Sequence, residues 1–270
     1  MFTFFTKRLL LLIFFLLCFR ASFAMINKID TLELKEQQKA RISTVDSLKQ
    51  ELDAIVDDSL KAPIYTQIAS EYIKYDTVRN KKQRHVYQNL AISNTMSAIH
   101  YYSKYDDTTG LRVSFDMLTK VYHAQHKYTQ AKWFILQSNT LSRAKNDNPN
   151  IISSLIELSS IKSDIKDYKL AIRDLNEALT ISTKNHYPKQ ESQVQLHYAL
   201  LYNVMKDYTK ATIALKRHNA IDDSIKRDEE AKMMAKLNMK DSLQLMKKKL
   251  YIIGNKKSYK ISSSKRIASL

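Results

Sequence analysis

The chain has 270 residues, and its 44 Lys and Arg against 27 Asp and Glu give a formal net charge of +17. Only two glycines, three prolines and one cysteine occur in it. Strand-rich folds need many tight turns built from glycine, proline or Asn-Gly pairs, so this scarcity predicts helices joined by short loops. It also excludes a glycine-rich phosphate-binding loop, and the lone Cys18 excludes a disulfide framework and a cysteine metal site.

Residues 1–24 have the layout of a secretory signal peptide. Two basic residues precede eleven apolar residues at 9–19, and small residues stand at Ser22 and Ala24, before the expected cleavage point. Eleven residues reach only about 16 Å as a helix, against roughly 30 Å for the hydrocarbon core of a bilayer. Cleavage is therefore favoured over retention as a membrane anchor, and we expect the chain to be exported, either to the periplasm or out of the cell.

Much of the positive charge lies towards the C-terminus. Residues 226–270 contain 13 basic and 4 acidic residues, and no acidic residue follows Asp241. Such a run is most often solvated, and weak contact with an anionic membrane surface is the alternative. Because an exported protein rarely meets nucleic acid, no nucleic-acid partner is expected.

Three segments repeat with a period of 40 residues, at 119–131, 159–171 and 199–211. In each one a tyrosine is followed three positions later by the alanine that ends the segment, and an aliphatic residue comes four positions beyond that alanine. Offsets of three, four and seven residues place side chains on one face of a helix, and alanine is small enough to let two helices approach closely. The predicted core of the repeat consists of Tyr128, Ala131, Ile135, Tyr168, Ala171, Leu175, Tyr208, Ala211 and Leu215.

This Tyr-x-x-Ala pattern, with a small residue twelve positions before the alanine, resembles the tetratricopeptide repeat (TPR), a helix–turn–helix unit of about 34 residues. The resemblance implies an all-α fold, a TPR-type superhelix of antiparallel helix pairs, with linkers of about six residues between units. The sequence departs from the pattern at Lys162, where an aromatic residue is expected, and at Gln195, where an apolar residue is expected. The expected units are an irregular one at 62–98 and regular ones at 112–145, 152–185 and 192–225.

The segments around the array complete the expected organisation. A helical segment at 25–60 precedes the array at 61–225, and a long C-terminal helix at 226–253 follows it, because no proline interrupts that stretch. The basic tail at 254–270 is predicted to be disordered. The arrangement resembles the exported sensor portion of bacterial TPR signalling proteins, in which a long helix leads from the array to a membrane span, although 226–270 contains no apolar run of that length.

In a TPR superhelix the first helices of the units line a concave groove, which is the expected binding surface. One TPR subtype clamps a peptide carboxylate with Lys and Asn at two groove positions, and Asp116 and Lys120 do not match that pair. Leu196 and Leu200 form either a peptide-binding stripe or, as is more usual in a last repeat, a face that the following helix covers. The residues expected to face the groove are Asp116, Lys120, His123, Ile156, Ser160, Ser163, Asp164, Leu196, Leu200 and Asn203.

No motif indicates catalysis or metal binding. His123 and His126 form an H-x-x-H pair, but a zinc site needs a third ligand, and polar residues are ordinary at the end of a first helix. The sequence contains no H-E-x-x-H and no G-x-S-x-G motif. We therefore expect no metal, no cofactor and no enzymatic activity.

Two functions remain open. The first is an exported scaffold that binds a protein or peptide of unknown identity in its groove. The alternative is the input part of a bacterial signal-transduction system, a truncated relative of TPR histidine kinases or TPR transcriptional regulators. In that case the C-terminal helix is the candidate for homo-oligomer formation as a coiled coil.

Overall fold

The computed structural model describes residues 44–77 and 80–267, all of them in helices or in the short segments that join them. The expected signal segment, 1–24, lies outside these residues. The chain forms two compact units, which divide between Asn146 and Asp147.

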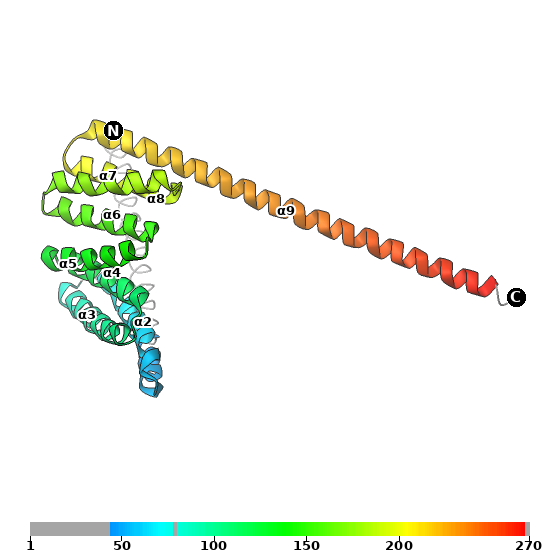
Figure 1. The fold of residues 1–270 in the computed structure, drawn as a ribbon, viewed down its shortest axis with the longest axis horizontal. Coiled ribbons are helices and arrows are strands. Elements are labelled where there is room, and N and C mark those ends of the chain that lie inside the picture. The colour runs from blue at the N-terminus through cyan, green and yellow to red at the C-terminus, as the bar shows by residue number, and fades with distance from the viewer. Residues whose placement is uncertain (1–43, 78–79, 268–270) are drawn as a thin grey trace, which may run out of the picture. The chain divides into compact units, whose positions relative to one another are not determined.

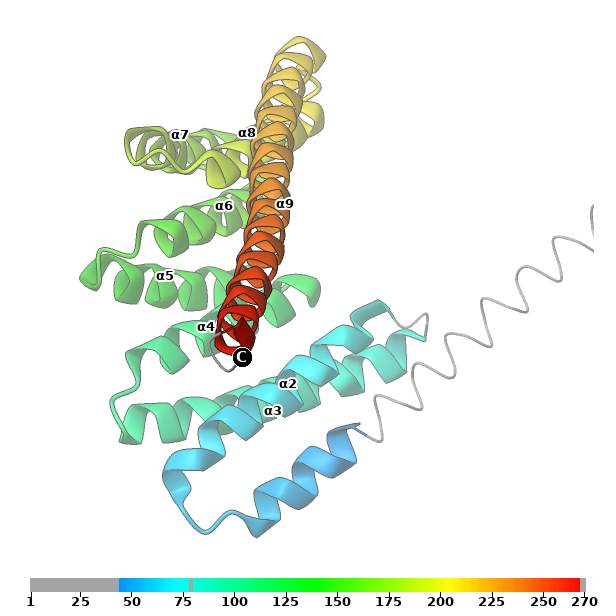
Figure 2. The same cartoon turned by 90° about the vertical axis from the view of Figure 1, so that its right-hand side faces the viewer.

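The first unit is built from helices packed in sequence order. α2 pairs with α3 and α4 with α5, and α3 also packs against α4. Figure 2 shows α2 and α3 side by side. The elements are a helix at 44–54, then η1 (Asp58–Leu60), α2 (Lys61–Ile73), η2 (Lys74–Thr77), α3 (Lys81–Lys104), α4 (Thr108–Ala124) and α5 (Tyr128–Ala144). One cluster of its core consists of Val45, Ile64, Ile68, Tyr72, Tyr75, Ala91 and Val121.

The second unit contains α6 (Asn148–Asp164), α7 (Tyr168–Lys184), α8 (Pro188–Val204) and α9 (Tyr208–Ile267). α6 pairs with α7 and α8 with α9, while α8 also packs against both α6 and α7. The described chain is thus all-α, with consecutive antiparallel helix pairs and a long C-terminal helix. The core includes Ile152, Leu155, Ala171, Leu175, Val194, Tyr198 and Leu201.

The 40-residue repeat consists of two halves of equal length. Each helix from α4 to α8 has 17 residues, and a three-residue connection follows each one. Linkers of about six residues were expected between the units, but they have only three. The connections between helix pairs are thus as short as the connections within a pair. The first helices and second helices consequently alternate every 20 residues from Thr108 onwards.

Each connection has the same backbone geometry. Its middle residue has a positive φ. In every connection except the one at 145–147, the next N–H also donates to the carbonyl five residues earlier, as from Lys127 to Tyr122 at 2.8 Å. This is the Schellman ending of a helix, which usually has glycine at the left-handed position. Here the position is held by Asp106, His126, Asn146, Lys166, His186 and Lys206.

α9 runs without a break for 60 residues. The last repeat helix, the expected helix at 226–253 and most of the tail at 254–270 are one element, where a separate helix and a disordered tail were predicted. Gly254 is the one glycine in this stretch, and a single glycine costs a helix only about 1 kcal/mol. Figure 1 shows α9 extending far beyond α8. Within residues 44–77 and 80–267, no helix combines the length and the apolar character needed to cross a membrane.

Candidate ligand-binding surface

On α4, the three residues expected in the groove lie four and three positions apart, on one side of the helix. Asp116 is held in place by Arg112, whose Nη1 lies 2.7 Å from its carboxylate, and by the hydroxyl of Ser138 on α5. Lys120 is exposed. Asp116 therefore connects α4 to α5 through its hydrogen bond with Ser138.

On α6, the expected groove residues divide between surface and core. Ser160 and Ser163 are half-buried and Asp164 is exposed. Ile156 is only 7 % exposed and belongs to the core of the second unit. Its prediction as a groove residue is corrected, because Ile156 lies in a core cluster together with residues of α7 and α8.

On α8, an apolar stripe reaches the surface. Leu196 is half-buried, Leu200 is 52 % exposed, and Val204, four residues further on, is 54 % exposed. In a last repeat, the following helix usually covers such a stripe. Here α9 pairs with α8, but Leu200 remains exposed. Asn203 is exposed on the same helix. We call the surface of Ser160, Ser163 and Asp164 on α6 with Leu196, Leu200, Asn203 and Val204 on α8 the α6–α8 face.

A titratable pair links the same two helices. The carboxylate of Glu157 on α6 interacts electrostatically with His197 on α8. Burial lowers the pKa of His197, and the attraction of Glu157 opposes that lowering. The attraction therefore acts between α6 and α8.

The residues predicted for the repeat core differ between units. Ala131, Ile135, Ala171 and Leu175 are at most 3 % exposed, and Tyr128 and Tyr168 are half-buried. In the last unit Ala211 is half-buried, whereas Tyr208 and Leu215 are 62 % and 44 % exposed. Their prediction as core residues is corrected: α8 packs on α7 and buries Leu175, whereas α9 is the last helix described and has no following pair on its corresponding face.

A Ser-His-Asp cluster that the sequence did not reveal joins α8 to α9. Ser192 Oγ lies 2.7 Å from His218 Nδ1 and donates a hydrogen bond to Asp222, whose carboxylate lies 3.8 Å from His218 Nε2. In a hydrolase triad the carboxylate orients the imidazole and the imidazole accepts the serine proton. Here Asp222 bonds the serine itself, and Ser192 is only 2 % exposed. The cluster is a helix-to-helix contact, and only the i, i+4 spacing of His218 and Asp222 hinted at it.

The two histidines of the H-x-x-H pair contact an aromatic ring. His123 and His126 lie edge-on to Tyr128, at 5.8 and 5.9 Å between ring centroids, and His126 Nδ1 lies 2.9 Å from the tyrosine hydroxyl. In the described part of the chain, no three His, Cys, Asp or Glu side chains gather closely enough to hold a metal ion.

Solved structures share this arrangement of helices. BtubC from P. vanneervenii is 15 % identical over 72 % of this chain and 78 % of its own, with a TM-score of 0.58. The apo form of RapI is 16 % identical over 72 % of this chain and 69 % of its own, also at 0.58. A STAND signal-transduction ATPase with a tetratricopeptide repeat sensor, from Pyrococcus horikoshii, is 18 % identical over 73 % of this chain and 29 % of its own, again at 0.58. The chain is a TPR-like helical repeat protein. No protein-family model and no curated protein matches the sequence.

The TPR-like repeat accounts for the arrangement of the polar groups described above. In repeat arrays of this kind, interfaces between neighbouring helices and repeats carry much of the stability. The hydrogen bonds of Asp116 with Ser138 and of Ser192 with His218, and the electrostatic attraction between Glu157 and His197, all cross such interfaces.

Proposed function

We propose that the chain is an exported scaffold that binds a peptide or a partner protein on its α6–α8 face. The observation that carries the proposal is the exposed stripe of Leu200 and Val204 on α8. Apolar side chains at this spacing form one continuous strip along a helix, and contact with an apolar partner removes that strip from water. The hydroxyls of Ser160 and Ser163 and the carboxylate of Asp164 supply polar groups beside it.

A pull-down from envelope extract tests this proposal. Leu200→Lys keeps the helix but places a charge in the strip, so partners captured by the unmodified chain should be lost. Leu237→Lys on α9 is the matched control, because Leu237 is 50 % exposed and lies outside the face. Equal capture by both variants would contradict the proposal.

Export is tested separately by the mass of the chain purified from cells, which should lack residues 1–24.

A second candidate, the input part of a signal-transduction system, is favoured by α9. Met239, Leu243 and Met246 are 66 %, 52 % and 60 % exposed, at the four- and three-residue spacing of a coiled-coil seam. If α9 couples the array to a second copy, light scattering should show a dimer that Leu243→Lys converts to a monomer. A monomeric unmodified chain would contradict this candidate.

A further inference from the structure

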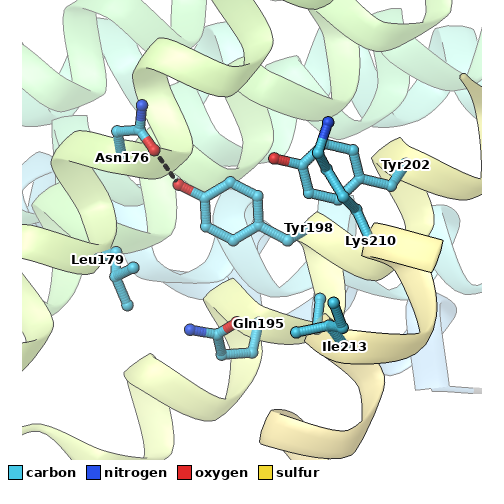
Figure 3. Close-up of a pocket in the computed structure, with 8 residues that line it drawn as sticks. Asn176, Leu179, Gln195, Tyr198, Tyr202, Lys210 and Ile213 are labelled. Carbon is cyan, nitrogen blue, oxygen red and sulfur yellow. Dashed lines mark hydrogen bonds between the residues drawn. The ribbon is translucent and has the colours of Figure 1, made fainter. Parts of the chain in front are cut away.

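A hollow of about 320 Å³ lies between α7, α8 and α9, lined by residues outside the α6–α8 face. Tyr198 and Tyr202 of α8 stack on each other there, with ring centroids 5.9 Å apart and planes inclined by 14°. Tyr198 donates its hydroxyl hydrogen to Asn176 of α7, which fixes its ring (Figure 3). Ile213 of α9 contributes an apolar wall, together with Ala214. The hollow therefore contains two stacked tyrosine rings, one of them fixed by a hydrogen bond, and is open to solvent.

The repeat explains why space is left at this position. In the first regular pair, Phe115 packs against Trp133 and Phe134, with ring centroids 6.5 and 6.1 Å apart. Eighty residues later the three corresponding positions are Gln195, Ile213 and Ala214, and all three line the hollow. Three aromatic rings of the first pair are thus replaced by an amide and two smaller side chains. Tyr198 replaces Leu118 on the same side, so one ring is gained where three are lost, and the place of the buried Phe134 is left to Ala214.

The polar groups around the hollow include several hydrogen-bond donors. Gln195 presents a side-chain amide, and the Asn176 amide still has its NH₂ group when its oxygen accepts from Tyr198. Lys210 lies at the rim, with Nζ 5.5 Å from the centre of the Tyr202 ring. It pairs with Asp207 at 2.8 Å, but its side chain is 60 % exposed, and such exposed pairs exchange readily for another anion.

We propose that this hollow binds an aromatic side chain of an acidic peptide segment. The ring takes the place that Phe115, Trp133 and Phe134 fill in the first regular pair, against Tyr198 and Tyr202. A carboxylate next to that ring in the peptide pairs with Lys210. The site is separate from the α6–α8 face, so it does not depend on the function proposed for that face.

The experiment uses the full chain and the probe peptide acetyl-Asp-Phe-Asp-amide, followed by NMR of the isoleucine methyl groups. The methyl signal of Ile213 should shift with the probe and not with acetyl-Asp-Ala-Asp-amide. The neutral acetyl-Asn-Phe-Asn-amide should bind about two- to fivefold more weakly, and Lys210→Gln should remove that difference. An equal shift with the alanine peptide would show that the hollow does not select an aromatic ring. Equal binding of the neutral peptide would show that Lys210 does not select an acidic segment.

Filling the hollow provides the second arm. Ala214→Phe restores the ring that Phe134 supplies in the first regular pair, so binding of the probe should weaken at least about tenfold. Ala220→Phe, the same change at an exposed position of α9, is the control and should bind like the unmodified chain. If Ala214→Phe lowers the melting temperature, Gln195→Phe is measured as well, because it fills the same hollow from α8. Leu200→Lys should leave binding of the probe unchanged, which separates this result from the α6–α8 face. Undiminished binding by both filled variants would overturn the proposal.

Discussion

Lys162 on α6 forms a buried ion pair with Asp174 on α7, at the two positions that Tyr122 and Phe134 occupy forty residues earlier. Tyr122 and Phe134 stack with ring centroids 5.5 Å apart and planes inclined by 1°. The same contact between a first and a second helix is therefore made by charges in one pair and by rings in another. This explains the departure of Lys162 from the repeat pattern, because its partner departs with it.

Removing one charge of this pair should destabilise the protein strongly. Lys162→Met leaves Asp174 buried, where its remaining neighbour is Arg173 at 3.5 Å, and such losses cost about 3–5 kcal/mol. The double change Lys162→Tyr with Asp174→Phe copies the pair from α4 and α5, and should restore stability or exceed it by about 1–4 kcal/mol. Urea unfolding of the three chains measures both effects. A double variant no more stable than Lys162→Met would contradict the equivalence of the two pairs.

Gly110 should not tolerate a methyl group. A Cβ built on it would lie 2.3 Å from the ring of Tyr102, whose hydroxyl oxygen is 3.2 Å from Thr66 Oγ1. Alanine would favour the helix by about 1 kcal/mol, but overpacking costs about 1–3 kcal/mol, so Gly110→Ala should lose about 1 kcal/mol in thermal unfolding. In the background of Tyr102→Leu, which makes room, the same change should be stabilising. A loss of equal size in both backgrounds would show that the ring is not the cause.

Lys166 has φ 64°, in the left-handed region that glycine adopts at no steric cost. Lys166→Gly should therefore raise the free energy of unfolding by about 0.5–1 kcal/mol, once the greater freedom of glycine in the unfolded chain is subtracted. Lys169→Gly, three residues later at an exposed position in the first turn of α7, is the control and should lose stability, by at most about 1 kcal/mol. Denaturant midpoints of the two variants should move in opposite directions.

His197 should make stability depend on pH. Because burial lowers its pKa in the folded chain, protons bind more readily to the unfolded chain. The contribution of neutral His197 to the free energy of unfolding is fully present above pH 6.5, the ordinary pKa of histidine. It is lost as the pH falls through the lowered pKa. The melting temperature of His197→Gln should therefore fall less than that of the unmodified chain on acidification. His85→Gln, at an exposed site on α3, should follow the unmodified chain. An identical acid response of His197→Gln and the unmodified chain would contradict the assignment.

The helix pairs could be predicted because the signals for them are local. Tyrosine, alanine and an aliphatic residue at offsets of three and four define a helix face wherever they occur, and Ala131 and Ala171 are fully buried. The scarcity of glycine likewise indicated helices and short loops, and six non-glycine residues take the left-handed turns between them. These features depend on a few neighbouring residues and so are readable from the chain itself.

The candidate sites were less accessible from the sequence. Ile156 was assigned to a groove but lies in the core cluster of the second unit. Leu215 was assigned to the core, although no following pair covers α9 in the described chain. Periodicity places a side chain on a face, but it does not say what lies against that face. The charged partner of Lys162, the contact of Ser192 with His218 and the hollow beside Tyr198 depend on residues 12 to 38 positions apart that meet only after packing.

The sequence by itself thus determined the 40-residue period, the helical class and the small residues where helices approach, because these follow from the geometry of one helix. Only the tertiary structure decided which members of a repeated column are buried, where a ring in one pair is replaced by an ion pair or by open space in another, and that α9 continues unbroken to Ile267. The reason is that burial and cavities belong to pairs of surfaces, and each surface is completed by a different part of the chain.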